Sequence, residues 1–189
     1  QGEPATANGV ASETKDASVA EHGARQHAKL SPSTLKSRAI CPGFRNDPDG
    51  DKTAADRGTF GHECVEHETP DRVVSDPQLR VAVEACIAYK RRVIRNSGGD
   101  AATVAQEIRL DYLGQWGFCD VLVVDGGGHR AHLIDWKFAW SRYHADSPQF
   151  WAYCIGVWDA HPAVESITVH VAHPFRGEID VETFSRSAH

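Results

Sequence analysis

The chain has 189 residues, of which 41% are hydrophobic and 24% are charged, and its formal net charge is −6. This length predicts one domain that buries a core without disulfide bonds, and the composition excludes collagen, coiled-coil and wholly disordered proteins. No apolar run approaches the roughly 18 residues of a transmembrane helix, so no membrane association is expected. The five cysteines form no CxxC pair, which favours a reducing cytoplasm over a disulfide framework or a structural zinc site.

The amino-terminal end differs in composition from the rest of the chain. Residues 1–28 are rich in Ala, Gly, Glu, Ser and Thr and show no hydrophobic period, which predicts a flexible arm. The folded domain is predicted over residues 29–189. Ser31 precedes Pro32, which combines a suitable N-cap with proline at the first helical position and predicts a short helix over 32–40.

Two longer helices are predicted next. One begins near Thr59, and the other is opened by Asp76-Pro77, carries apolar residues at helical spacing, and ends at Gly98-Gly99. The last turns of the second helix contain a basic run, Lys90, Arg91, Arg92 and Arg95. We interpret this run as a solvated helix end rather than a surface that meets DNA phosphates.

The second half of the chain changes to a strand period. Strands are predicted over 103–110, 118–125, 131–138 and 166–173, and a helix over 147–159. The glycine-rich turn at 126–129 makes the second and third strands a β-hairpin. The order of elements predicts an α/β fold with a central mixed β-sheet, which contains a three-stranded antiparallel meander and is flanked by helices.

Two carboxylates interrupt these apolar strands. If Asp125 pairs with Arg130 across the turn, Asp120 lies directly opposite Asp135, with Cβ atoms about 4.5–5.5 Å apart. Lys137 follows Asp135 by two residues and therefore projects from the same face. Facing like charges in a buried sheet are unfavourable unless something neutralises them, and oxygen ligands favour Mg²⁺ or Mn²⁺. The pattern predicts metal-assisted hydrolysis of a phosphodiester.

A structural alternative exists for the same residues. Asp120 and Asp135 could lie on the surface near a turn, with Lys137 as an ion-pair partner. Their neighbours argue against this, because charged residues within apolar strands are seldom fully buried without a partner. The apolar neighbours are Val121, Leu122, Val123, Leu133 and Ile134.

Three short motifs follow one another in a characteristic order. They are GTFGHE at 58–63, Asp120 at the end of a GxxD pattern with Asp135-Trp136-Lys137 on the next strand, and QFWAY at 149–153. Together they resemble the GTxxH segment, the catalytic core and the QxxxY motif of RecB-type PD-(D/E)XK nucleases. Within that superfamily the chain is most similar to an uncharacterised phage-encoded family. The resemblance covers about residues 27–185.

The resemblance implies a restriction-endonuclease-like core and a set of metal ligands. Asp120 and Asp135 would bind the ion, joined by the His62 side chain and the Trp136 carbonyl. Glu107, in the first strand, would lie near the metal as a ligand of a second ion or as an outer partner. Asp135 stands where many relatives have Glu, which gives a shorter but chemically adequate arm.

The resemblance also implies catalytic roles. Asp120, Asp135 and Lys137 would form the catalytic set, with Lys137 as the catalytic lysine. Gln149 and Tyr153 are one helical turn apart, hence on one helix face, and in the family this face helps to orient the lysine and the DNA strand. No cysteine follows Cys154, so the iron–sulfur cluster of some RecB-type nucleases is not expected.

The resulting expectation is a Mg²⁺- or Mn²⁺-dependent deoxyribonuclease in the cytoplasm of a phage-infected host. An exonuclease in phage recombination or replication is favoured, because no base-reading element is evident. The alternatives are a non-catalytic nuclease-fold module that binds DNA or a phage protein, and a metal-dependent hydrolase of another substrate. The tryptophans at 136, 140, 151 and 158 are interpreted as core residues rather than base-stacking platforms, with an exception left open for Trp140, just past the catalytic strand.

Overall fold

The computed structural model describes residues 31–41 and 53–188, and the predicted arm at 1–28 lies outside the described residues. A 3₁₀ turn, η2 (Pro32–Thr34), comes first, and the helices and strands follow in this order: α1 (Leu35–Ile40), α2 (Thr53–Glu66), α3 (Pro77–Asn96), β1 (Thr103–Tyr112), β2 (Gln115–Val124), β3 (Arg130–Trp136), α4 (Pro148–Ala160), β4 (Ser166–His173) and β5 (Glu178–Ser185).

The five strands form one mixed sheet in the order β1-β2-β3-β4-β5. Strands β1, β2 and β3 are successively antiparallel, β4 is parallel to β3, and β5 is antiparallel to β4. The predicted α/β class with a helix-flanked mixed sheet is therefore confirmed. The sheet as a whole is not a three-stranded antiparallel meander, because β4 and β5 extend it on the far side of β3.

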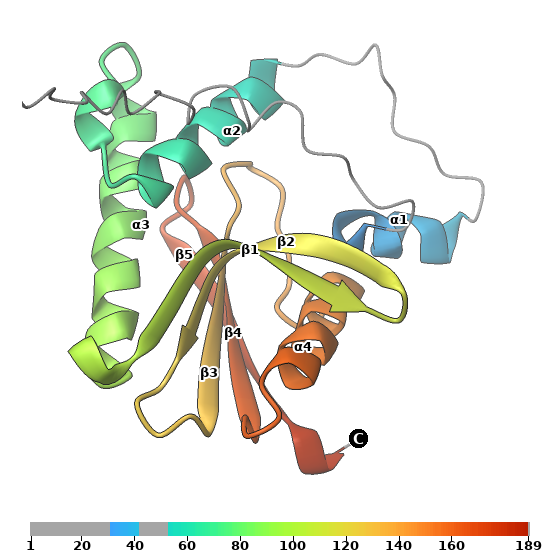
Figure 1. Ribbon diagram of the computed structural model, residues 1–189. Helices are drawn as coiled ribbons and strands as arrows, with labels where there is room; N and C mark the ends of the chain where they lie inside the picture. The colour runs from blue at the N-terminus through green and yellow to red at the C-terminus, as the bar shows by residue number, and fades with distance from the viewer. Residues whose placement is uncertain (1–30, 42–52, 189) are drawn as a thin grey trace, which may run out of the picture.

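The sheet is covered by helices on both faces. Figure 1 shows α3 on one side of the strands and α4 on the other. One core cluster packs α4 against the sheet through residues such as Phe150 and Leu133, and a second packs α2 and α3 through residues such as Val83 and Ile134. Within the described part of the chain, every helix is too short or too polar to cross a membrane.

The helix boundaries agree with the sequence patterns in three cases and differ in one. Helix α4 lies within one residue of the predicted range 147–159 at both ends. The segment predicted at 32–40 is η2 followed by α1, and α3 begins at Pro77 after Asp76, whose carboxylate accepts a hydrogen bond from the Leu79 N–H at 2.9 Å. Helix α2 begins at Thr53 rather than near Thr59. Glycine is unfavourable within a helix by about 1 kcal/mol, but Gly58 is tolerated here because the packing of α2 outweighs this cost.

The β2–β3 hairpin has the predicted register. The Asp125 N–H donates to the Arg130 carbonyl at 2.9 Å, and the ladder runs from Val124–Ala131 to Val121–Ile134. The next positions along the two strands are Asp120 and Asp135. The two acids therefore lie where the pairing of β2 with β3 stops, at the carboxyl end of β3.

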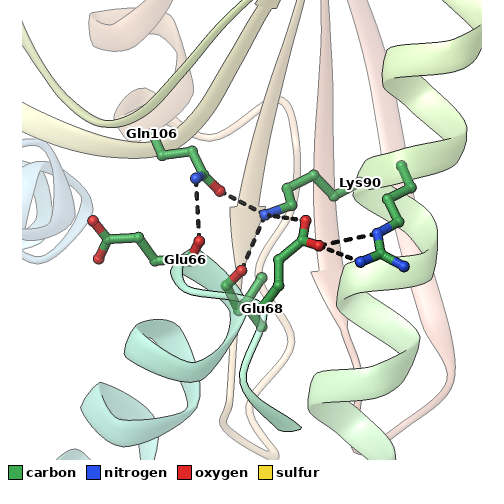
Figure 2. A network of polar contacts seen from close by, with 6 residues as sticks. Glu66, Glu68, Lys90 and Gln106 are labelled. Carbon is green, nitrogen blue, oxygen red and sulfur yellow. Dashed lines mark hydrogen bonds and ion pairs between the residues drawn. The ribbon is translucent and has the colours of Figure 1, made fainter. Parts of the chain in front are cut away.

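A buried lysine joins α2, α3 and β1, as Figure 2 shows. The ammonium of Lys90 donates to the Val65 carbonyl at 3.0 Å and the Gln106 side chain at 2.6 Å, and it pairs with Glu68 at 3.0 Å. Glu68 also pairs with Arg91. The interpretation of this basic run as a solvated helix end is wrong for Lys90, whose side chain is only 3% exposed.

Candidate metal and phosphodiester site

A cavity of about 310 Å³ opens where the β2–β3 ladder ends. Its walls come from η2, α2, β2, the end of β3 and the start of α4. Six residues singled out from the sequence line it: His62, Asp120, Asp135, Lys137, Gln149 and Tyr153. The structure thus brings together side chains that are separated by up to 91 positions in the chain.

Asp120 connects three elements at this cavity. Its Oδ2 atom lies 3.3 Å from Nδ1 of His62, on α2, and accepts the backbone N–H of Trp136, on β3, at 2.6 Å. The Asp120 carboxylate therefore satisfies the Trp136 backbone N–H, just beyond the last residue pair of the β2–β3 ladder. The Trp136 indole is buried in the core, and the contact with Asp120 comes from the N–H. A ligand role for the Trp136 carbonyl stays a prediction.

Three side chains have the arrangement of a metal-ligand set. One potential ligand atom from each of His62, Glu107 and Asp120 lies within 4.8 Å of the others. Glu107 has a backbone φ of +48°, in the left-handed region that a residue with a side chain seldom adopts. The β1–β2 ladder omits the Glu107 position and resumes in the same register on either side. The backbone departs from the strand conformation at the residue that completes the cluster.

Asp135 has a different set of contacts. Its Oδ2 atom is 2.6 Å from Nζ of Lys137, and its Oδ1 atom accepts a hydrogen bond from the Gln149 amide at 3.3 Å. The side chain is 4% exposed. Asp135 lines the same cavity but is not among the three clustered ligand residues. The expected face-to-face acid pair is therefore divided between a cluster around Asp120 and an ion pair at Asp135.

The two carboxyl groups have opposite pKa shifts. Burial raises the pKa of Asp135 to about 6; Lys137 counteracts this rise, and the Asp120 charge adds to it. Burial also acts to raise the pKa of Asp120, but His62, Lys137 and the Trp136 N–H outweigh it and hold that pKa below its ordinary value. Asp120 is thus a stable anion, whereas ionisation of Asp135 is opposed by its surroundings.

The cations of the site hold their charge because of these acids. Burial acts to lower the pKa of Lys137, but Asp135 and Asp120 outweigh it and raise that pKa above its ordinary value. The pKa of His62 is likewise raised, because the nearby Asp120 outweighs the effect of burial. A metal ion that binds His62 must displace its proton, whereas Lys137 remains an ammonium.

Two glycines allow the walls of the cavity to come together. A Cβ atom at Gly117 would lie 2.5 Å from the Pro32 ring, so η2 packs directly on the backbone of β2. A Cβ atom at Gly61 would lie 3.0 Å from the Phe138 ring, next to His62. The glycines of the GxxD and GTxxH segments thus have a packing role.

The two QxxxY residues on α4 form hydrogen bonds with the strands that carry the acids. Gln149 donates to Asp135, and the Tyr153 hydroxyl donates to the Phe118 carbonyl on β2. Both are buried and line the cavity. Their contacts are with the protein itself, which is consistent with positioning of the acidic strands.

The sequence patterns did not identify every residue of the cavity wall. Ser31, Ser33 and Trp116 also line it. Ser31 has the extended conformation of an N-cap, but its side chain makes no capping hydrogen bond, and its Oγ atom lies 3.3 Å from that of Ser33. No local signal places Ser31 and Ser33 at the cavity, because η2 reaches it through packing on Gly117 of β2 and on α4.

No protein-family model and no curated protein sequence matches this chain.

Proposed function

We propose that the chain is a divalent-cation-dependent deoxyribonuclease with a restriction-endonuclease-like PD-(D/E)XK core. The observation that carries this proposal is that His62 and Asp120, two members of a His/Glu/Asp cluster, line one cavity together with a buried Asp–Lys pair. Burial of acids within apolar strands is unfavourable unless a partner compensates their charge. An exonuclease that acts in phage recombination or replication, in the host cytoplasm, is the form of this proposal that the motifs favour.

The donor set fits a small divalent cation. His62, Glu107 and Asp120 offer one nitrogen and two carboxylate oxygens within 4.8 Å of one another. Ligands of Mg²⁺ or Mn²⁺ lie about 2.0–2.2 Å from the ion, so a small movement would bring the three atoms to one centre. The imidazole favours Mn²⁺ over Mg²⁺, because Mg²⁺ prefers oxygen ligands. Asp135 is a further candidate ligand, and binding of the ion would replace part of its contact with Lys137.

A bound ion supplies an activated water and polarises a phosphoryl oxygen. The remaining work belongs to side chains. Because its pKa is raised, Lys137 is an ammonium at neutral pH and is suited to neutralising charge on the scissile phosphate rather than to accepting a proton. Asp135 holds the ammonium at 2.6 Å, and Gln149 in turn holds Asp135.

The test is hydrolysis of fluorescent single-stranded and double-stranded DNA in Mn²⁺ and in Mg²⁺. We expect the Lys137→Ala variant to be slower by about 100-fold or more, the usual effect of removing one charge-stabilising group. The matched control is Arg130→Ala, a cation removed at the opposite end of β3, where Arg130 pairs with Asp125 on the surface. This control should retain the parental rate.

Two outcomes would contradict the proposal. If Lys137→Ala cleaves as fast as the parent protein, Lys137 has no catalytic role and the assignment to this nuclease class is wrong. If the parent protein binds DNA but cleaves neither substrate in either metal, the chain is a non-catalytic nuclease-fold module. Cleavage of other phosphodiesters but not of DNA would agree with the proposed metal site and contradict the proposed substrate.

A further inference from the structure

One aromatic side chain near the cavity is exposed and rigidly supported. The Trp140 indole is 59% exposed, and it lies three residues beyond Lys137, in the segment between β3 and α4. Its ring is stacked on Phe175, from the turn between β4 and β5, with a centroid distance of 5.8 Å and an interplanar angle of 27°. One ring face is therefore supported by protein, and the exposed area leaves room for a partner.

A chain of rings connects this indole to the candidate metal ligands. Phe175 meets Phe138 edge to face at 5.9 Å, and Phe138 meets the His62 imidazole in the same way at 5.4 Å. Phe138 is buried, and its ring fills the space over Gly61. Trp140 is thus held in place relative to His62 through two intervening rings rather than by a free loop.

One cation contacts the aromatic cluster directly, and two more lie close to Trp140 in the sequence. The Arg57 guanidinium lies 4.2 Å from the centroid of Phe175, and Asp76 fixes it there through an ion pair of 2.7 Å. Arg142 is exposed two residues after Trp140. Lys137 precedes Trp140 by three residues, and its ammonium lies 5.1 Å from the centroid of the Tyr143 ring. Tyr143 is 40% exposed. The surface around Trp140 therefore has exposed rings with cations nearby, of which Arg57 and Lys137 pair with Asp76 and Asp135.

We infer that Trp140 is a stacking platform for an unpaired nucleobase and that the substrate of the neighbouring site is single-stranded DNA. An exposed aromatic ring binds bases through their faces, and cations beside it bind the sugar–phosphate backbone. In a duplex those base faces are covered by neighbouring pairs, so a protruding indole discriminates in favour of an unpaired strand. This inference deepens the proposed nuclease function and rests on it for the identity of the chemistry.

Binding is tested separately from cleavage. The affinity of a fluorescently labelled twelve-residue oligothymidylate and of a blunt duplex of equal length is measured by anisotropy in Ca²⁺, with intact DNA verified on a gel. We expect Trp140→Ala to weaken binding of the single strand by roughly 10-fold, the typical effect of losing one base–aromatic contact. Duplex binding should change less than about twofold, and Trp140→Phe should retain most of the single-strand affinity.

The matched control is Leu113→Ala, because Leu113 is 83% exposed at the β1–β2 turn and takes no part in the aromatic cluster. It should bind both DNAs as the parent protein does. Equal single-strand affinity of Trp140→Ala and the parent would overturn the inference, as would an equal loss for both DNAs. If the alanine variant is unfolded by circular dichroism, the same comparison with Trp140→Leu, which keeps an apolar side chain, decides the question.

The failures of the two proposals are distinguishable. A parent protein that binds the oligothymidylate through Trp140 but does not cleave it in Mn²⁺ retains the platform and loses the nuclease function. A parent protein that cleaves DNA, with a Trp140→Ala variant that binds and cleaves the single strand equally well, retains the nuclease function and loses the platform.

Discussion

Lys90 and Lys137 both lie beside carboxylates in the interior, and their surroundings differ. Lys90 has three acceptors, from Val65, Gln106 and Glu68, and its side chain is 3% exposed. Lys137 pairs with Asp135, is 17% exposed, and faces a cavity that a second acid also lines. The ammonium of Lys90 can donate three hydrogen bonds, and all three are used by protein.

The difference separates a structural polar network from a candidate site. A fully satisfied buried network stabilises one arrangement of its elements, and the Lys90 network holds the end of α2 against α3 and β1. Asp120 and Asp135 line the cavity, and burial raises the pKa of Asp135 to about 6. A buried acid whose ionisation is opposed, next to an open volume, is expected where a cation or substrate completes the charge.

The largest effect is expected from breaking the satisfied network. Lys90→Met leaves the Val65 carbonyl and the Gln106 side-chain oxygen without their donor, whereas Glu68 keeps its pair with Arg91. Each buried acceptor left unsatisfied costs about 1–3 kcal/mol. Lys137→Met should cost less in stability, because water in the cavity can solvate Asp135. Urea denaturation of both variants measures the difference. Equal losses would mean that the cavity and the Lys90 network do not differ in the way described.

A third polar cluster, around His170, should make the free energy of unfolding depend on pH. His170 on β4 contacts the Tyr89 hydroxyl at 2.9 Å and His132 at 3.0 Å. Burial, with the nearby charges of His132 and Arg92, lowers the pKa of His170 from 6.5 to about 4. The unfolded chain therefore binds more protons between these pH values, and the free energy of unfolding falls as pH drops through this range.

This shift corresponds to roughly 3 kcal/mol of stability that is present near neutral pH and lost by about pH 4. Urea denaturation from pH 4 to 7 measures it. The His170→Gln variant should show a shallower slope over this range, although its stability at pH 7 is also lower. An unchanged slope would assign the pH dependence to other groups.

Adding a metal ion should stabilise the folded protein by binding at the cavity, and not at the Lys90 network. At 100 times its dissociation constant, Mn²⁺ raises the free energy of unfolding by about 2.7 kcal/mol if it binds only the folded protein. Asp120→Asn should abolish this gain. Asp71→Asn, an exposed acid paired with Arg80, should retain it. Thermal denaturation with and without Mn²⁺ gives the comparison, and an equal gain in Asp120→Asn would place the ion elsewhere.

The smallest effect is expected at Asp135. Because the pKa of this carboxyl is raised to about 6, its ionised form at pH 8 opposes folding. Asp135→Asn removes that charge but also the ion pair with Lys137. These two effects oppose one another, so the free energy of unfolding should change by less than about 1 kcal/mol in metal-free buffer. Urea denaturation in EDTA measures the change, and a DNA cleavage assay should show loss of activity. A large loss of stability would make the Asp135–Lys137 pair structural.

Much of the sheet follows from local sequence patterns. The turn at 126–129 and the alternation around it predict the β2–β3 register, which places Asp120 and Asp135 at adjacent positions at the end of the ladder. Strand β5 is not predicted, because only Phe184 within it is buried and the strand exists through its pairing with β4. An edge strand with little buried surface carries a weak local signal.

The site divides in the same way. The motif spacing predicts that His62, Asp120 and Lys137 are close, and all three line one cavity. The resemblance also implies that Glu107 lies near this set, and one potential ligand atom of Glu107 does lie within 4.8 Å of those of His62 and Asp120. The spacing does not predict that Asp135 contacts Lys137 and Gln149 instead of joining the same cluster. Those choices depend on how α2, β1 and α4 pack, and a single left-handed residue at Glu107 cannot be recognised from its neighbours in the chain.

The sequence by itself determined the order of the helices and of strands β1 to β4, the hairpin register and the candidate site residues, because periodicity and turn chemistry act over a few residues. Tertiary structure decided which acid meets which cation, that Lys90 is enclosed while Lys137 faces a cavity, and that Trp140 stands exposed on Phe175. The contacts of Lys90, the stacking of Trp140 on Phe175 and the pair of His62 with Asp120 join residues from 16 to 58 positions apart in the chain. Most depend on the packing of whole helices on the sheet, so local sequence cannot specify them.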